Sequence, residues 1–285
     1  MSTKLDQLTQ DQSLALNLQD TETYIHPALI QTDLSPKGRA LVVIAPVPAG
    51  TVLIADTPYA VVPTVPPDRK DEGVICSNLL CRARVPRSGN AAHCPRACML
   101  DVLWCNTHCR DMDQARHNFE CSWLKRYGDE IRRKTGQDDL VLLWIVVRML
   151  AAGFLEQNTT AEVNHAQKGG AKGSSFPWED RFERHWMAIE SMRSNREHWP
   201  RTKIEHWRYL VKEYLSDNQL LPGLLDSDDM LTLICKAMVN TYDLYDAPTG
   251  PAETQRKQGP AYGLGVYLRA TWVNHSCLPN VRPLS

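Results

Sequence analysis

Residues 76–121 decide the fold, and they spell CSNLLCRARVPRSGNAAHCPRACMLDVLWCNTHCRDMDQARHNFEC. Seven of the nine cysteines of the chain fall within this stretch, and only Cys235 and Cys277 lie outside it. Together with one histidine they form four spaced pairs, which are Cys76-x4-Cys81, Cys94-x3-Cys98, Cys105-x3-Cys109 and His117-x3-Cys121. Eight ligands of this kind are enough for two tetrahedral Zn²⁺ sites.

The spacing and the size of this cysteine-rich stretch both favour bound metal. The last two pairs have i,i+4 spacing, which on a helix places both side chains on one face. A unit of about 45 residues is too small to be stable by apolar burial alone, so metal would supply much of its folding free energy. Seven thiolates (−7) and two Zn²⁺ (+4) leave a formal charge of −3, which nearby arginines such as Arg87, Arg96 and Arg116 can offset. We expect His93 and His108 at the surface rather than among the ligands.

The rest of the composition limits the cellular setting and the partners. The opening residues lack the layout of a signal peptide, so we expect a reducing compartment, the cytosol or the nucleus, and metal ligation rather than disulfides. A net charge of −1 gives no bulk electrostatic reason for a nucleic-acid or membrane partner. The spacing of the pairs does not match fingers that present a helix to DNA. The apolar run at residues 141–155 contains Arg148 and is too short for a membrane span, so it predicts a buried helix.

The remaining segments predict a mixture of short strands and helices, an α+β fold. Residues 41–45 and 51–54 are β-prone and are separated by a Pro- and Gly-containing turn at 46–50. Helical patterns cover 115–127, 138–155 and 228–240, and the aromatic residues of 176–215 have helix spacing that indicates a packing core. Residues 156–175 are polar and rich in Gly, Ala and Lys, and they predict a flexible loop.

The order and spacing of the eight ligands resemble the MYND zinc finger, which ends in a helix bearing the His-x3-Cys pair. In that family the two sites interleave. The resemblance therefore implies one zinc held by Cys76, Cys81, Cys105 and Cys109, and a second held by Cys94, Cys98, His117 and Cys121.

The sequences on either side of the finger resemble the two ends of a SET domain. Lys37-Gly-Arg-Ala-Leu41, followed by Pro48-Ala-Gly-Thr-Val-Leu53, resembles its start, and Asn274-His-Ser-Cys277 with Pro279-Asn280 resembles its signature motif. Because both bracket a MYND-like finger and a helical insert in the family's order, the chain resembles the SET and MYND domain family of protein lysine methyltransferases. The resemblance implies split SET-domain sheets interrupted by the finger and the insert. The implied units are residues 1–32 (polar segment), 33–66 (first SET part), 76–121 (finger), 122–235 (helical insert) and 236–285 (incomplete SET core).

The same resemblance implies S-adenosylmethionine as cofactor and a set of residues that contact it. These are Lys37, Arg39, Asn240, Thr271, Asn274 and His275, although Ala40 stands where the family has its second glycine. The family's catalytic tyrosine lies beyond the signature motif, where only residues 281–285 follow Asn280, so we expect a SET domain cut short and name no catalytic residue. Cys277 would then be a third-zinc ligand without partners.

Two functions therefore stay open. The first is S-adenosylmethionine-dependent methylation of lysine in a protein substrate, histone or non-histone. The second is a non-catalytic, zinc-dependent interaction module in which the finger docks proline-rich partners on a SET remnant.

Overall fold

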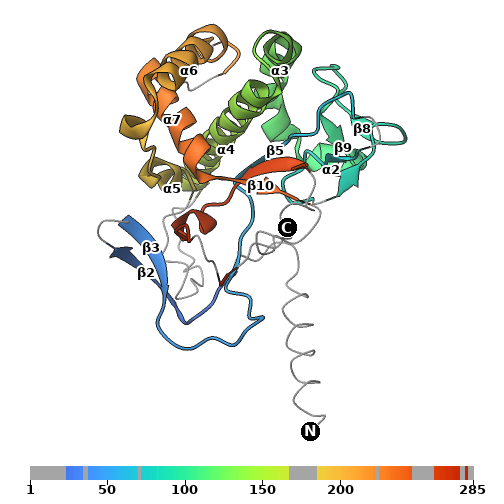
Figure 1. Ribbon diagram of the computed structural model, residues 1–285. Helices are drawn as coiled ribbons and strands as arrows, with labels where there is room; N and C mark the ends of the chain where they lie inside the picture. The colour runs from blue at the N-terminus through green and yellow to red at the C-terminus, as the bar shows by residue number, and fades with distance from the viewer. Residues whose placement is uncertain are drawn as a thin grey trace.

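The computed structural model describes residues 24–34, 38–69, 72–81, 83–166, 185–217, 219–221, 225–245, 260–276 and 280–281. Helices and strands are mixed among them, which confirms the α+β class (Figure 1). The strands are β1 Tyr24–Ile25, β2 Leu29–Leu34, β3 Gly38–Val43, β4 Ile54–Ala55, β5 Ala60–Pro63, β6 Val74–Ile75, β7 Arg84–Val85, β8 Ala92–His93, β9 Leu103–Trp104, β10 Thr241–Leu244 and β11 Gly263–Val266. The helices are α2 Thr107–Met112, α3 Gln114–Lys134, α4 Gln137–Ala166, α5 His185–Ser191, α6 Arg201–Tyr214 and α7 Ser227–Asn240, with 3-10 turns η2 Arg196–His198 and η3 Ala270–Trp272.

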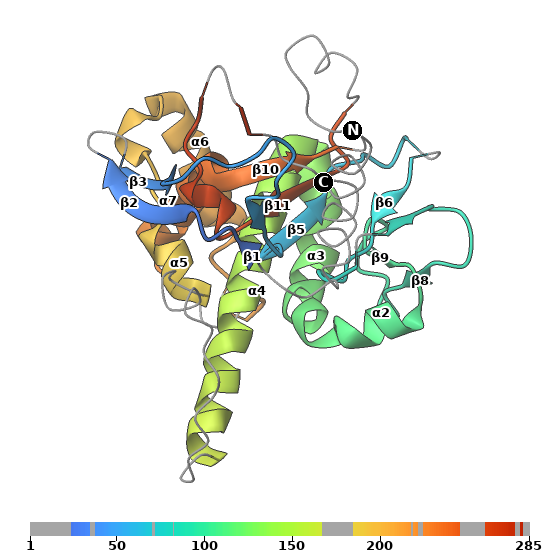
Figure 2. The same ribbon diagram turned by 90° about the horizontal axis from the view of Figure 1, so that it is seen from below.

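A three-stranded antiparallel sheet in the order β10-β11-β5 lies at the centre of the molecule (Figure 2). It joins a strand from before the finger to two strands near the end of the chain, because Val61 lies opposite Gly265 and Leu244 lies opposite Gly263. All four residues of β5 are buried, as expected for a strand covered on both faces. Helix α4 packs against this strand.

Helix α4 is the central helix of the core. Every residue from Leu140 to Ala151 is buried, including Arg148, so this part of the helix is covered on all sides. The predicted helix at 138–155 is thus confirmed, and the burial predicted for 141–155 is confirmed as far as Ala151. No helix in the described part of the chain has the length and apolar character to cross a membrane. The helix continues to Ala166, so the first half of the predicted loop 156–175 is helical; its end lies outside the described residues.

The first hairpin differs from the expected strand, turn and strand at 41–54. The pairing runs instead between β2 and β3, with Leu29 opposite Val43 and Leu34 opposite Gly38. The second expected strand is reduced to β4, which pairs with β1. The prediction missed β2 because its sequence, LIQTDL, mixes polar and apolar residues and lies in the segment assigned to a polar N-terminus. The hairpin lies on the opposite side of the central sheet from the cysteine-rich stretch (Figures 1 and 2).

The cysteine-rich stretch is continuous with the main core rather than a separate module. One hydrophobic cluster contains Trp104 and Leu103 of this stretch, Trp123 and Leu124 of α3, and the apolar residues of α4 from Leu140 to Ala151. The long helix α3 begins inside the stretch and packs along α4 beyond it. The finger and the helical insert therefore share one interior.

Helices α6 and α7 complete the helical layer above the sheet (Figure 1). Helix α6 buries Ile204, Trp207 and Tyr214 at helix spacing, and Trp199 packs edge-on against Trp207. This confirms the packing role predicted for Trp199 and Trp207, whereas residues 176–184 of the same segment lie outside the described residues. The predicted boundary between residues 235 and 236 falls inside α7.

Candidate metal centres and cofactor site

The structure gathers the eight predicted zinc ligands into two groups of four. One contains Cys76, Cys81, Cys105 and Cys109, and the other contains Cys94, Cys98, His117 and Cys121. Within each group all ligand atoms lie within 4.8 Å of one another. The two groups match the interleaved pairing that the MYND resemblance implies.

The first group, hereafter the outer centre, is built from strand ends and the start of a short helix. Cys105 Sγ lies 3.7 Å from Cys81 Sγ and 3.4 Å from Cys109 Sγ. The side chain of Asn106 accepts a hydrogen bond from the Cys109 amide at 2.8 Å and caps α2. The expectation that Cys105 and Cys109 share one helix face is therefore wrong: Asn106 starts the helix after Cys105, and the two thiols meet across the cap.

The second group, hereafter the inner centre, takes two ligands from α3, where the expected i,i+4 geometry is present. His117 Nε2 lies 3.2 Å from Cys94 Sγ and 3.8 Å from Cys98 Sγ, and Cys94 Sγ lies 3.6 Å from Cys121 Sγ. Ala97, with a φ of 47°, forms the tight turn that brings Cys98 back toward Cys94.

Both groups fit tetrahedral zinc. Zn–S bonds of about 2.3 Å place tetrahedral sulfur atoms about 3.8 Å apart. The sulfur–sulfur distances of 3.4 to 3.7 Å match that edge and are far from the roughly 2.05 Å of a disulfide. All seven cysteines are free thiols, so both centres could hold zinc. His93 and His108 are exposed and outside both groups, as predicted.

The thiols are crowded, and this shapes their ionisation. Burial, with repulsion from Cys121 and Cys94, raises the pKa of the Cys98 thiol. Burial and hydrogen bonds to neighbouring thiols raise the pKa of Cys105 to about 11. A divalent cation at each centre would reverse this penalty, because metal binding favours the thiolate.

The arginines expected to offset the thiolates mostly have other partners. Arg87 pairs with Asp101, and Arg116 pairs with Asp113 and Glu120. Arg96 does act on a ligand, since its charge lowers the pKa of the Cys121 thiol against the larger effect of burial.

Three of the predicted cofactor contacts lie together beside β3 and the end of α7. The Arg39 carbonyl accepts a hydrogen bond from Asn274 Nδ2 at 3.1 Å, and its guanidinium lies 4.5 Å above the Trp272 ring. Asn240 Nδ2 donates to the carbonyl of Arg193 at 3.0 Å. The Arg193 guanidinium fills the space where a side chain at Gly38 would lie, and the φ of +74° at Gly38 also favours glycine there.

No family model matches the chain. A SET and MYND domain-containing protein of Dictyostelium discoideum is 24% identical over 267 residues, which cover 86% of this chain and 47% of the relative. A second SET and MYND domain-containing protein of that organism is 23% identical over 138 residues, covering 47% of this chain and 25% of the relative. The comparison supports the SET and MYND resemblance. The chain spans about half the length of the first relative and a quarter of the second.

The other contacts implied by the SET and MYND resemblance are less clearly placed. The Thr271 hydroxyl donates to the Leu268 carbonyl at 2.8 Å, a local turn contact. His275 is exposed next to Asn274. Lys37 and Cys277 lie outside the described residues.

Sequence reasoning missed three polar residues at this site. Arg39 Nη1 donates to Ser191 Oγ at 2.5 Å, Arg193 packs over Gly38, and Lys236 Nζ donates to the Glu190 carbonyl at 2.7 Å. Lys236 stands one helical turn before Asn240, so its position on that face was available from the spacing. Ser191 and Arg193 have no such local signal, because they are about 150 residues from Arg39 in the chain.

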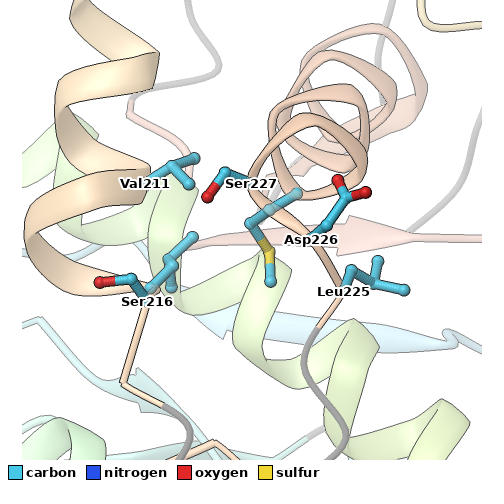
Figure 3. A pocket seen from close by; sticks show the side chains of 7 residues that line it. Val211, Ser216, Leu225, Asp226 and Ser227 are labelled. Carbon is cyan, nitrogen blue, oxygen red and sulfur yellow. The ribbon is translucent and has the colours of Figure 1, made fainter.

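A pocket of about 380 Å³ lies elsewhere, between the end of α6 and the start of α7 (Figure 3). Val211, Leu225 and Met230 contribute apolar walls, and Asp226 lies at its rim. The Asp226 carboxylate already accepts hydrogen bonds from two amides at the start of α7. None of the predicted metal or cofactor residues lines this pocket.

Proposed function

We propose that this chain is the SET and MYND part of an S-adenosylmethionine-dependent protein-lysine N-methyltransferase. One observation carries the proposal: Arg39, Asn240 and Asn274, from three distant segments, lie together around Gly38 and Arg193. Two relatives that share the SET and MYND name support it. The split SET arrangement, with the finger and helical insert between its parts, belongs to the same proposal.

The residues of the site are suited to the carboxylate end of an amino-acid-like ligand. S-adenosylmethionine, when bound, supplies an electrophilic methyl group for a lysine amine. The Arg39 guanidinium, held by Ser191 and the Trp272 ring, is a donor for a carboxylate. The amides of Asn240 and Asn274 donate to the main chain of Arg193 and Arg39, and so keep both cationic residues in place.

Cofactor binding tests this proposal without requiring turnover. Calorimetric titration of the chain with S-adenosylmethionine should show one site, weakened about 10- to 100-fold by Arg39→Ala, because charge-assisted hydrogen bonds contribute about 1.5–3 kcal/mol. Arg201→Ala, which removes an exposed arginine paired with Glu205, is the matched control and should bind like the parent chain. No binding by the parent chain, or equal weakening by both substitutions, would reject the proposal.

We also propose that zinc occupies both centres, that a protein bearing lysine is the substrate, and that the protein acts in the cytosol or nucleus. The donor sets of thiolate and imidazole support zinc over Mg²⁺ or Ca²⁺, which prefer oxygen ligands. Transfer of labelled methyl groups from S-adenosylmethionine to histones or cell proteins tests the substrate class.

A second function is favoured by a specific feature of the finger surface. Leu80, Leu100 and Met112 of the finger are each more than half exposed, so each is accessible to an apolar, proline-rich peptide. Leu100→Ser should weaken capture of such a peptide and leave cofactor binding unchanged. If Leu100→Ser has no effect on peptide capture, the docking function fails.

A further inference from the structure

A buried group of charges lies directly behind the inner centre. It contains two carboxylates, Asp113 and Glu120, and two guanidinium groups, Arg116 and Arg148, so it is formally neutral. All four residues are at most 5% exposed. Burying an ion pair costs several kcal/mol of desolvation per ion unless every group is well satisfied, so such a group calls for an explanation beyond stability.

Glu120 is the hub of this group. Its Oε1 accepts from Arg116 Nη1 at 2.7 Å and lies 3.4 Å from His117 Nδ1. Its Oε2 accepts from Trp144 Nε1 at 2.8 Å and from Arg148 Nε at 3.1 Å. Three donors, Arg116 Nη1, Trp144 Nε1 and Arg148 Nε, converge on the two oxygens of Glu120, so both oxygens act as acceptors and one of them faces the ring nitrogen of His117.

The second nitrogen of His117 faces the thiols, since Nε2 lies 3.2 Å from Cys94 Sγ. A carboxylate on the other ring nitrogen of a metal-bound histidine orients the ring, fixes its tautomer and makes it a better ligand. Glu120 stands where such a carboxylate must stand. His117 is also packed edge-on against the Trp104 ring at 5.0 Å, so its plane is constrained from a second side.

The far side of the hub reaches the central sheet. Arg148 lies on α4, one turn after Trp144, and both side chains point to Glu120 on α3. Arg148 Nη1 also donates to the carbonyl of Val61 in β5, which is the strand that pairs with β11. One continuous chain of contacts therefore runs from the inner centre through His117, Glu120 and Arg148 to β5.

We propose that Glu120 is the positioning carboxylate of the inner metal centre, and that it couples metal loading there to the order of strand β5 through Arg148. In the loaded protein, His117 Nδ1–H donates to Glu120 and Nε2 binds the metal. The inference rests on metal binding at the inner centre, which belongs to the proposed function, and does not depend on methyl transfer.

The first test is metal affinity in the full chain, with Co²⁺ as a probe, because its absorption depends on whether the ligands are four thiolates or three thiolates and an imidazole. Glu120→Gln should weaken the inner centre by about 10- to 100-fold and leave the outer centre unchanged. Glu130→Gln makes the same change on the exposed side of α3, where Glu130 pairs with Lys134, and should match the parent chain. Equal weakening of both centres by Glu120→Gln, or no weakening, would overturn the positioning role. A parent chain that binds no Co²⁺ would reject the metal proposal itself.

The second test separates the coupling from the metal site. Arg148→Lys leaves Glu120 and His117 in place but cannot reproduce the forked contacts to Glu120 and Val61. In the parent chain, metal loading should slow hydrogen exchange at the amides of residues 60–62, and this slowing should be lost in Arg148→Lys, while exchange in α6 matches the parent chain. Unchanged exchange at β5 would overturn the coupling.

A third measurement uses only the parent chain, so it tests the proposal even if either variant fails to fold. With ¹¹³Cd at the inner centre and ¹⁵N-labelled histidine, the metal should couple to His117 Nε2, and Nδ1 should carry the proton. Metal coupling to Nδ1 would overturn the proposal, because that nitrogen would then be unable to donate to Glu120.

Discussion

The outer and inner centres have nearly the same ligand chemistry but different surroundings. Cys81 and Cys105 of the outer centre are partly exposed, and their neighbours are turns and short strands. All four ligands of the inner centre are buried, and two of them lie on α3, which packs along α4. Because of this difference, a metal at the outer centre would order finger loops at the surface, whereas a metal at the inner centre would hold the joint between the finger and the helical core.

The largest expected effect follows removal of an inner ligand. Cys121→Ala should cost more than about 5 kcal/mol of unfolding free energy, because loss of a structural metal adds to a buried defect beside charged groups. Chemical denaturation followed by tryptophan fluorescence would measure it, since Trp123 and Trp144 lie next to this joint.

Cys235→Ala is the matched control for this substitution. Cys235 is fully buried on α7 and belongs to neither metal group, so it behaves as a small apolar side chain. Its loss should cost about 1 kcal/mol. Equal costs for the two substitutions would mean that the inner centre holds no metal.

Removal of an outer ligand should cost less. We expect Cys81→Ala to lower the unfolding free energy by about 3 kcal/mol and to leave the helical circular dichroism signal intact, because the outer centre orders short loops. In the parent chain, a chelator should remove the outer metal faster than the buried inner one. Faster release from the inner centre would contradict the contrast between the two.

Loss of the hydrogen bond between the helical core and Glu120 should have the next largest effect on stability. Trp144→Phe removes the indole N–H that donates to Glu120, and loss of a hydrogen bond to a charged group should cost about 2 kcal/mol. Trp186→Phe removes a similar bond to exposed Glu190 and should cost much less. Thermal unfolding of both variants measures the difference, and similar melting temperatures would count against a structural role for the hub.

The smallest effect concerns the helix cap of the outer centre. Asn106→Ala removes the acceptor for the Cys109 amide and should cost about 1 kcal/mol, with weaker metal binding at the outer centre alone. Asn106→Asp keeps an acceptor and should restore both stability and affinity. If Asn106→Ala affected the inner centre equally, the two centres would not be independent.

The candidate metal ligands could be predicted from the sequence, because they follow a local spacing pattern. The pairs from Cys76 to Cys121 name the residues that the structure gathers into two groups, and the MYND resemblance implied the interleaving of those groups. The buried helix around 138–155 was also predictable, because a run apolar on every face has no solvent side.

Long-range partners could not be predicted from the same patterns. Glu120 lies between Phe119 and Cys121 in the sequence, and no local pattern predicts its role. That role depends on hydrogen bonds from Trp144 and Arg148 of another helix. Arg193 and Gly38 are far apart in the sequence, and only the folded structure brings them into contact. The β2 strand was missed because cross-strand pairing with β3, rather than its own composition, stabilises it.

The zinc content of the purified chain and of two variants shows whether the two centres are separate metal sites. Elemental analysis of freshly purified protein should find two zinc ions per chain, one in Cys81→Ala and one in Cys121→Ala, with native mass spectrometry assigning the loss to a single centre each time. A parent chain without zinc, or two ions retained in both variants, would mean that the two groups of ligands are not separate zinc sites.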